Sequence, residues 1–276
     1  MTVARERLAI QPVGGDAWLI QNPGRPGNRL SVTAADRRAA RKVMRRHQLS
    51  LVRYLATEHI AWMLRELQIT CVLDVGANIG QYGQALRSAG YTGRIVSFEP
   101  LPHLADQLLR ASADDPDWHV MRCALGEAEH EAEMSVTPGR GTTSSLLPAS
   151  DFGKAWSPSL EGTHRQNVLV RRLDGLFDEV VEGLDSPRVY LKLDTQGYDL
   201  QAFRGAGNRM ADIVGLQSEV SSVPIYDGMP RLIEQIPVYE AAGFEITGMF
   251  PVSIDRKSLR VIEFDTVMIR VEALER

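Results

Sequence analysis

The stretch "CVLDVGANIGQ", from Cys71 to Gln81, decides the fold. It opens with a short apolar run, which is typical of a buried strand, and passes through an acid and several small residues before helical spacing begins. Gly76 and Gly80 carry no side chain, so the backbone there can approach a ligand and the next helix can pack close to the strand. The stretch therefore predicts a strand, a ligand-binding turn and a helix, in that order.

The same rhythm repeats along the chain after this stretch. Short apolar runs ending in polar residues alternate with segments of helical spacing, which predicts a mostly parallel sheet covered on both faces. The C-terminus breaks the rhythm, because two apolar runs follow each other there without a helix and predict an antiparallel hairpin at the sheet edge. The expected strands are residues 70–76, 93–100, 117–123, 188–194 and 212–220, and the hairpin runs are "FEITGMFPVSID" and "SLRVIEFDTVMIRV".

The N-terminal part has a different pattern. Turn residues predict a hairpin around Gly14–Gly15, then a Pro/Gly loop, then two helices over 33–68. We expect residues 1–69 to form an extension that packs on a core of residues 70–276. The Gly-, Ser- and Pro-rich segment 139–162 predicts a long loop, which we interpret as a mobile lid over the acceptor.

The composition of the chain limits which classes of function are expected. The chain of 276 residues has a formal net charge of -4, so no general attraction to nucleic acid or to an anionic membrane is expected. Its two cysteines, Cys71 and Cys123, form no CxxC motif, and no apolar run reaches the length of a membrane span. These features favour a cytoplasmic protein without membrane insertion.

Four of the predicted strands bring an acid to their carboxyl ends. Asp74, Glu99, Asp194 and Glu219 should converge, because ligands of an open parallel sheet bind beyond that edge. The glycine spacing is GxxxG instead of the GxGxxG of a pyrophosphate site, and Asp74 would repel a phosphate. A nucleoside that carries a cation fits better, which points to S-adenosylmethionine, with Glu99 accepting from the ribose hydroxyls.

At this point the sequence resembles a known family. The blocks "LDVGANIGQYGQAL", "SFEPLPHLADQL", "CALGE", "GTTSSL", "LKLDTQGYDLQAFRGA" and "SEVSSVPIYDGMP" are similar, in order, to those of FkbM-type methyltransferases, over roughly residues 70–270. The resemblance implies a Rossmann-like class I methyltransferase fold, S-adenosylmethionine as donor, and O-methylation of a sugar, glycolipid or natural product. Gln196 and Asp199 depart from the "DVEGxE" more usual in the family, whereas Asp194 is retained.

Residue roles follow within this frame. Asp194 is the expected base, Glu219 its partner and His164 the weaker alternative, while Lys192 should stabilise Asp194. The two carboxylates could instead bind Mg²⁺, but the sequence favours catalysis without a metal. Ser144 and Ser145 are candidates for lining the donor or the acceptor site, Tyr226 and Asp227 for the acceptor site, and a homodimer is left open. The residues expected to bind the donor are Asp74, Gly76, Asn78, Gly80, Gln81, Glu99, Pro100, Cys123, Ala124 and Asp194.

Two other functions share part of this pattern. An NAD-dependent oxidoreductase would have the same early order of strand, helix and acid, but it predicts GxGxxG and a YxxxK motif, which the chain lacks. A non-catalytic nucleoside-binding module would have no need for Asp194 and Glu219 together at the sheet end. The sequence therefore favours an enzyme that uses S-adenosylmethionine.

Overall fold

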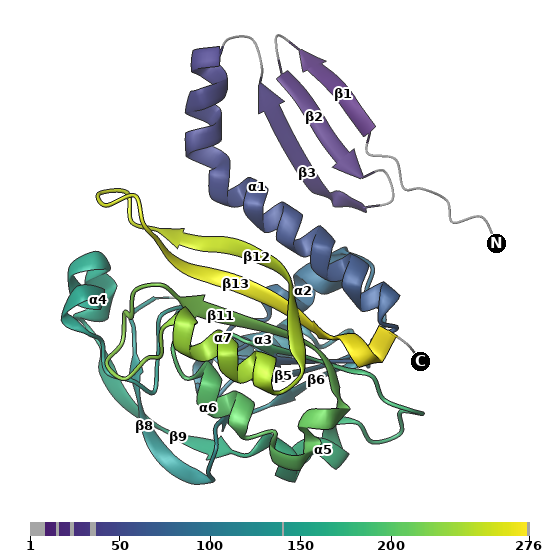
Figure 1. Ribbon diagram of the computed structural model, residues 1–276, viewed down its shortest axis with the longest axis vertical. Helices are drawn as coiled ribbons and strands as arrows, with labels where there is room; N and C mark the ends of the chain where they lie inside the picture. The colour runs from purple at the N-terminus through teal and green to yellow at the C-terminus, as the bar shows by residue number, and fades with distance from the viewer. Residues whose placement is uncertain (1–8, 15–16, 23–24, 34–36, 140, 275–276) are drawn as a thin grey trace.

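The computed structural model describes residues 9–14, 17–22, 25–33, 37–139 and 141–274. Its first part is a three-stranded antiparallel sheet followed by one long helix that runs across the main body (Figure 1). The hairpin expected around Gly14–Gly15 has its two strands in β1 and β2, while Gly15 itself lies outside the described residues. The elements are β1 (Ala9–Gly14), β2 (Ala17–Asn22), β3 (Arg25–Thr33) and α1 (Arg37–Glu66).

Two predictions for this N-terminal part are wrong. The Pro/Gly loop expected after the hairpin is largely strand β3, which pairs with β2. The two helices expected over 33–68 are the single 30-residue helix α1. Residues 37–66 contain neither glycine nor proline, so no residue in them breaks a helix. Ile60, Met63 and Leu64 near its C-terminal end are buried against the main sheet.

The main sheet has seven strands in the order β12-β13-β11-β10-β4-β5-β6. The neighbours from β11 to β6 pair in parallel, and β13 is antiparallel to both β11 and β12. This confirms the predicted class I methyltransferase fold with an antiparallel C-terminal hairpin. The strands are β4 (Cys71–Val75), β5 (Arg94–Phe98), β6 (Trp118–Met121), β10 (Val189–Leu193), β11 (Ile213–Ser221), β12 (Phe244–Ile254) and β13 (Val261–Arg270).

The connections reverse direction between β4 and β10. After β4 the chain builds β5 and β6 on one side, and it later returns to place β10 and β11 on the other. In doubly wound sheets a ligand crevice opens at such a point, outside the carboxyl ends of the strands. The topology therefore places the expected site above β4 and β10.

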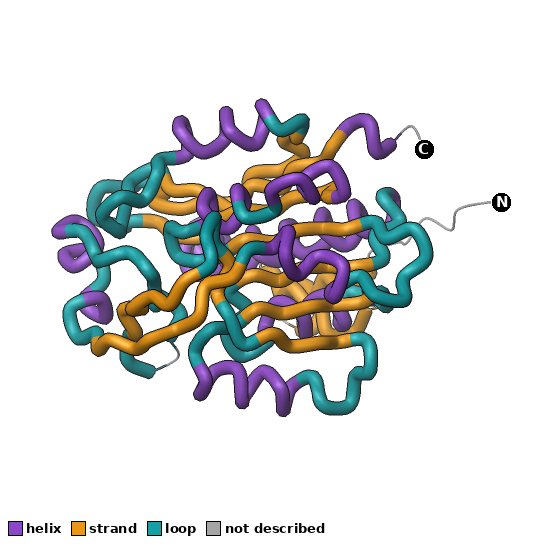
Figure 2. Tube along the Cα trace, turned by 90° about the horizontal axis from the view of Figure 1, so that it is seen from below, coloured by secondary structure: helices purple, strands orange, loops and turns teal. Residues whose placement is uncertain are grey.

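Helices cover both faces of the main sheet (Figure 2). One core packs α5, α6 and α7 against the sheet, and the other packs α1, α2 and α3 against the opposite face. None of the helices in the described part of the chain combines the length and the hydropathy that a membrane span requires. The helices are α2 (Gln81–Ser88), α3 (Pro102–Ala111), α5 (Leu173–Val180), α6 (Asp199–Arg204) and α7 (Leu232–Ala241), with short 3-10 turns η2 (Gly207–Asp212) and η3 (Val271–Leu274).

A second small sheet lies beside the main one, in the order β7-β9-β8. Its strands are β7 (Ala124–Leu125), β8 (His130–Val136) and β9 (His164–Arg171). The segment between β8 and β9 carries α4 (Asp151–Trp156) and η1 (Pro158–Leu160), so it is not a featureless loop. Ser145 pairs with Ser135, and Ala149 with Tyr226, which fixes the segment at two points.

The turn after β4 is held tightly between its neighbours. The main-chain nitrogens of Gly76 and Ala77 donate to the Phe98 oxygen at 3.1 Å, and that of Asp194 donates to the Val75 oxygen at 3.1 Å. Gly76 has φ +77°, and a Cβ atom at this position would lie 1.9 Å from the Asp194 main-chain oxygen. The closeness of the turn to the end of β10 therefore requires glycine here.

Gly76→Ala should lower the free energy of unfolding by more than Gly90→Ala does. Gly90 also has a left-handed φ, +87°, but a Cβ there meets nothing within 4 Å. Both variants carry the backbone strain, so their difference isolates the steric clash, which we expect to be about 1–3 kcal/mol. Urea unfolding of the two variants measures it, and equal destabilisation would contradict the close approach.

Candidate active site

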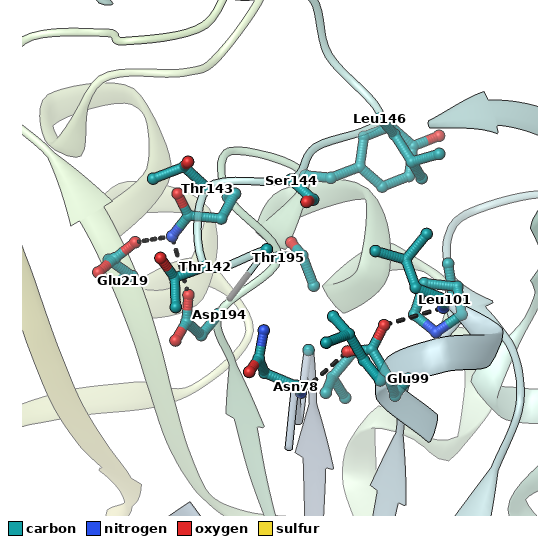
Figure 3. Close-up of a pocket in the computed structure, with 18 of the residues that line it drawn as sticks. Asn78, Glu99, Leu101, Thr142, Thr143, Ser144, Leu146, Asp194, Thr195 and Glu219 are labelled. Carbon is teal, nitrogen blue, oxygen red and sulfur yellow. Dashed lines mark hydrogen bonds between the residues drawn. The ribbon is translucent and has the colours of Figure 1, made fainter. Parts of the chain in front are cut away.

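A cavity of about 330 Å³ opens at the carboxyl ends of β4, β5, β10 and β11. Figure 3 shows its lining, with Asn78 and Glu99 at one end and Asp194 and Glu219 at the other. The segment between β8 and α4 and the hairpin β12–β13 also contribute. The residues from those parts are Gly141, Thr142, Thr143, Ser144, Leu146, Trp156, Val252, Ser253 and Glu263.

The turn after β4 supplies one wall of the cavity through Gly76, Asn78 and Gln81. Asn78 adopts a left-handed φ of 51°, and its Oδ1 accepts from the Ile79 main-chain nitrogen at 2.9 Å. Gly80 does not line the cavity. A Cβ there would lie 2.8 Å from Leu108 Cδ1, so this glycine serves the packing of α2 against α3.

Glu99 is fixed at the end of β5 by two main-chain donors. Its Oε2 accepts from the Asn78 nitrogen at 2.9 Å and its Oε1 from the Leu101 nitrogen at 2.9 Å. Burial raises the pKa of Glu99 to about 7, against the two main-chain hydrogen bonds, which lower it. Each oxygen keeps a lone pair that can accept from a ligand. Pro100, next along the chain, also lines the cavity.

Asp74 lies outside the cavity, although the sequence placed it at the donor. Side chains alternate along β4, so Asp74 points with Val72 toward the α1 and α2 face, where it is 0% exposed. There Lys192 Nζ, from the neighbouring register position on β10, lies 3.0 Å from Asp74 Oδ1. Burial lowers the pKa of Lys192, but Asp74 and then Asp194 raise it more, so the net shift is upward.

Gln196 joins Asp194, which directly follows β10, to Glu219 near the carboxyl end of β11. Its Nε2 donates to Asp194 Oδ1 at 3.1 Å and to Glu219 Oε2 at 2.8 Å, as the dashed lines in Figure 3 show. Lys192 Nζ lies 3.6 Å from Asp194 Oδ2, closer to Asp74 than to this expected partner. Asp194, at 36% side-chain exposure, faces the cavity.

Further buried acids surround this pair. Burial, followed by Glu263 and Asp194, raises the pKa of Glu219 well above its usual range. Burial likewise raises the pKa of Glu263 to about 7, although Ser253 Oγ donates to its Oε2 at 2.8 Å. Asp265 is raised to a pKa of about 6 by burial and by Asp194. The site therefore favours protons on its buried carboxyl groups.

Asp199, one of the two positions that depart from the family pattern, ties the loop after β10 to β11. Its Oδ1 accepts from the Thr195 main-chain nitrogen at 2.7 Å. Its Oδ2 accepts from Ser218 Oγ at 2.8 Å and from the Glu219 main-chain nitrogen at 3.1 Å. Asp199 is buried and does not line the cavity, so its contacts are structural.

Some of the remaining predicted residues line the cavity, and the others lie outside it. Ala124 and Ser144 line the cavity, while Cys123 packs in the core, where burial raises its pKa to about 11. His164 is exposed at the start of β9 and does not line the cavity. Tyr226 Oη lies 2.9 Å from Gln196 Oε1, whereas Asp227 is exposed.

The sequence did not point to Glu263, although it carried a signal. Glu263 and Asp265 are separated by one apolar residue in "RVIEFDTVMIRV"; Glu263 is buried and Asp265 is half-buried. Two acids on one face of a strand expected in a sheet are unusual enough to mark a site. Thr142 and Thr143 stand in the "GTTSSL" block, but nothing in the sequence assigns them an individual role, because their place depends on how a loop folds.

Most of the residues that line this site lie in a part of the chain that matches a known protein family. Residues 74–246 match the family described as Methyltransferase FkbM domain. A stretch of 81 residues, 29% of the chain, is 35% identical to the AMB antimetabolite synthetase AmbE of Pseudomonas aeruginosa. The chain spans only 4% of the length of AmbE.

The chain is also similar to solved structures. A fibrillarin of Aeropyrum pernix in complex with S-adenosyl-L-methionine is 11% identical, with 95% of this chain and 100% of that chain covered, at a TM-score of 0.46. Magnesium protoporphyrin IX methyltransferase of Synechocystis with bound donor is also 11% identical, over 83% and 82% of the two chains, at a TM-score of 0.43. Likeness at this level says nothing about the acceptor.

The raised pKa of Glu263 should make stability depend on pH. Because the folded state holds its proton up to about pH 7 while the ordinary carboxyl value is 4.5, its contribution is complete below pH 4.5 and is lost as pH rises to 7. Glu263→Gln should therefore remove a decline on the order of 1–3 kcal/mol between pH 5 and 8. Urea unfolding at several pH values measures this, with the exposed Glu131→Gln as control. Parallel curves for wild type and Glu263→Gln would contradict the prediction.

Proposed function

The chain belongs to the FkbM methyltransferase family and is an S-adenosylmethionine-dependent methyltransferase, and from this we propose that it methylates a hydroxyl of a sugar, glycolipid or natural product. The observation that supports O-methylation is the pair Asp194 and Glu219, held together at the opposite end of one cavity from Glu99. The family match decides against an NAD-dependent oxidoreductase. We further propose that residues 70–276 form the catalytic domain, with 1–69 as an extension, and that the protein is cytoplasmic.

The Glu99 end of the cavity fits the donor. Glu99 is preset by its two main-chain donors and has lone pairs left for both ribose hydroxyls. Gly76 brings the backbone close without a side chain, and Asn78, Gln81, Pro100 and Ala124 complete that wall. In our proposal Asp74 acts only indirectly, by holding Lys192 beneath the turn.

The opposite end of the cavity suits an alcohol acceptor. When bound, S-adenosylmethionine supplies a methyl group on a positively charged sulfur that leaves as a neutral thioether. The residues must align the acceptor oxygen with that methyl group and remove the hydroxyl proton. Asp194 is placed to accept the proton, because it ends a central strand and its carboxylate is partly exposed in the cavity. Gln196 and Lys192 restrict where that carboxylate can point.

Donor binding should require Glu99. Calorimetry should detect binding of S-adenosylhomocysteine and none of NAD. Glu99→Gln keeps the shape but removes the charge, and Glu99→Ala removes both hydrogen bonds to the ribose, which should weaken binding by roughly 2–4 kcal/mol. An S-adenosylhomocysteine affinity that is the same in wild type and both variants would show that Glu99 only orders the loops around it.

Asp194 should carry the proton transfer and His164 should not. Asp194→Asn keeps shape and donor binding but should lower the turnover number by about 10²–10⁴. His164→Ala should have little effect, since His164 is exposed outside the cavity. Transfer of a radiolabelled methyl group from the donor into small-molecule extracts measures both. An inactive His164→Ala together with an active Asp194→Asn would reverse the assignment.

A further inference from the structure

Gln196 is held from several sides. Its backbone has a left-handed φ of 55°, unusual for a residue other than glycine, and its main-chain oxygen accepts from Ser145 Oγ at 2.7 Å. Its side-chain Oε1 lies 2.9 Å from Tyr226 Oη. The oxygens of Asp194 and Glu219 accept hydrogen bonds, so the amide nitrogen faces them and Oε1 faces Tyr226.

The amide nitrogen lies where a bridging cation would be expected. It is 3.1 Å from Asp194 Oδ1 and 2.8 Å from Glu219 Oε2, and its two hydrogens suffice for one hydrogen bond to each. Two carboxylates that end adjacent strands otherwise form a ready pair of ligands for Mg²⁺ or Mn²⁺, whose ligands are mainly oxygens. An amide N–H group is a donor and cannot serve as such a ligand.

The position of the Gln196 amide is surrounded by acidic groups. Groups from every neighbouring element act on Glu219: Glu263 and Asp265 on β13, Asp199 on α6 and Asp194 after β10. The nearby cation Lys192 on β10 is closest to Asp74, at 3.0 Å. So many acids would attract a divalent cation if the position between Asp194 and Glu219 were open.

We propose that Gln196 is a positioning residue whose amide replaces a divalent cation between Asp194 and Glu219, so that the methyl transfer proceeds without a metal. This inference rests on the proposed function for its catalytic consequence. Its structural part, that the amide prevents a metal from binding between the two carboxylates, stands independently of it. Gln196 holds Asp194 in place for the acceptor, a task that a metal ion would otherwise perform.

Gln196→Glu is the matched test variant. It keeps the length of the side chain and an oxygen for Tyr226, but it removes both N–H donors and adds a third carboxylate. Titration of Mn²⁺, followed by electron paramagnetic resonance, should show no saturable site in wild type at micromolar concentrations. The variant should bind Mn²⁺ at least about tenfold more tightly, because affinity rises with the number of charged ligands. The double variant with Asp194→Asn should lose this gain.

Two results of the Mn²⁺ titration would overturn the proposal. One is a wild-type Mn²⁺ site that Asp194→Asn abolishes, and the other is equal Mn²⁺ affinity in wild type and Gln196→Glu when thermal unfolding shows both to be folded. Wild-type methyl transfer should also be unchanged by EDTA, while Gln196→Glu in EDTA should lower kcat without changing the KM for the donor. Activity lost in EDTA and restored by Mg²⁺ would contradict the proposal in the same way.

The proposed function is checked separately. Calorimetry with S-adenosylhomocysteine on the same wild-type sample tests the donor site, which does not involve Gln196. A failure to bind S-adenosylhomocysteine would count against the proposed function and leave the Mn²⁺ comparison intact. Donor binding together with a wild-type metal site would instead refute only the role of Gln196.

Discussion

The structure around the cavity depends on the buried ion pair between Lys192 and Asp74. Their atoms are 3.0 Å apart, on β10 and β4, the two central strands between which the connections reverse. Removing one partner of such a pair leaves the other as an uncompensated buried charge, which typically costs about 3–5 kcal/mol. Lys192 Nζ also lies 3.3 Å from the Gly76 oxygen and 3.6 Å from Asp194 Oδ2. One cation thus connects the turn after β4 to Asp194.

Most of the fold could be predicted, because apolar runs and helical spacing are local signals. The parallel strands from β4 to β11 and the antiparallel hairpin were predicted on that ground. One error arose because strand pairing overrides a local turn signal. Proline and glycine in residues 25–33 suggested a loop, yet pairing with β2 makes this segment a strand. Strand β9 was missed because only its partner β8 gives its polar residues a sheet to join.

The candidate site was predicted where a residue lies at the tip of a strand and less well elsewhere. Glu99 and Asp194 line the cavity because each directly follows a parallel strand, and Glu219 lines it from near the carboxyl end of β11. Asp74 lies inside β4, in register with Lys192 of β10, so its carboxylate is buried beside that lysine and does not reach the cavity. In the sequence, Gln196 stands where the family pattern more often has a glutamate. Its contacts became visible only in the folded chain, where three separate segments meet around it.

The hairpin β12–β13 reaches the cavity through Val252, Ser253 and Glu263, whereas the Glu99 end of the cavity is built from β4, β5 and the segments that follow them. The two ends of the cavity therefore come from opposite halves of the sheet order. The pairing of β12 and β13 also contains register shifts near Pro251 and Ser253, where an insertion would disturb few ladder contacts. In the proposed assignment, changes in this hairpin would therefore alter which acceptor fits without changing the residues assigned to the donor.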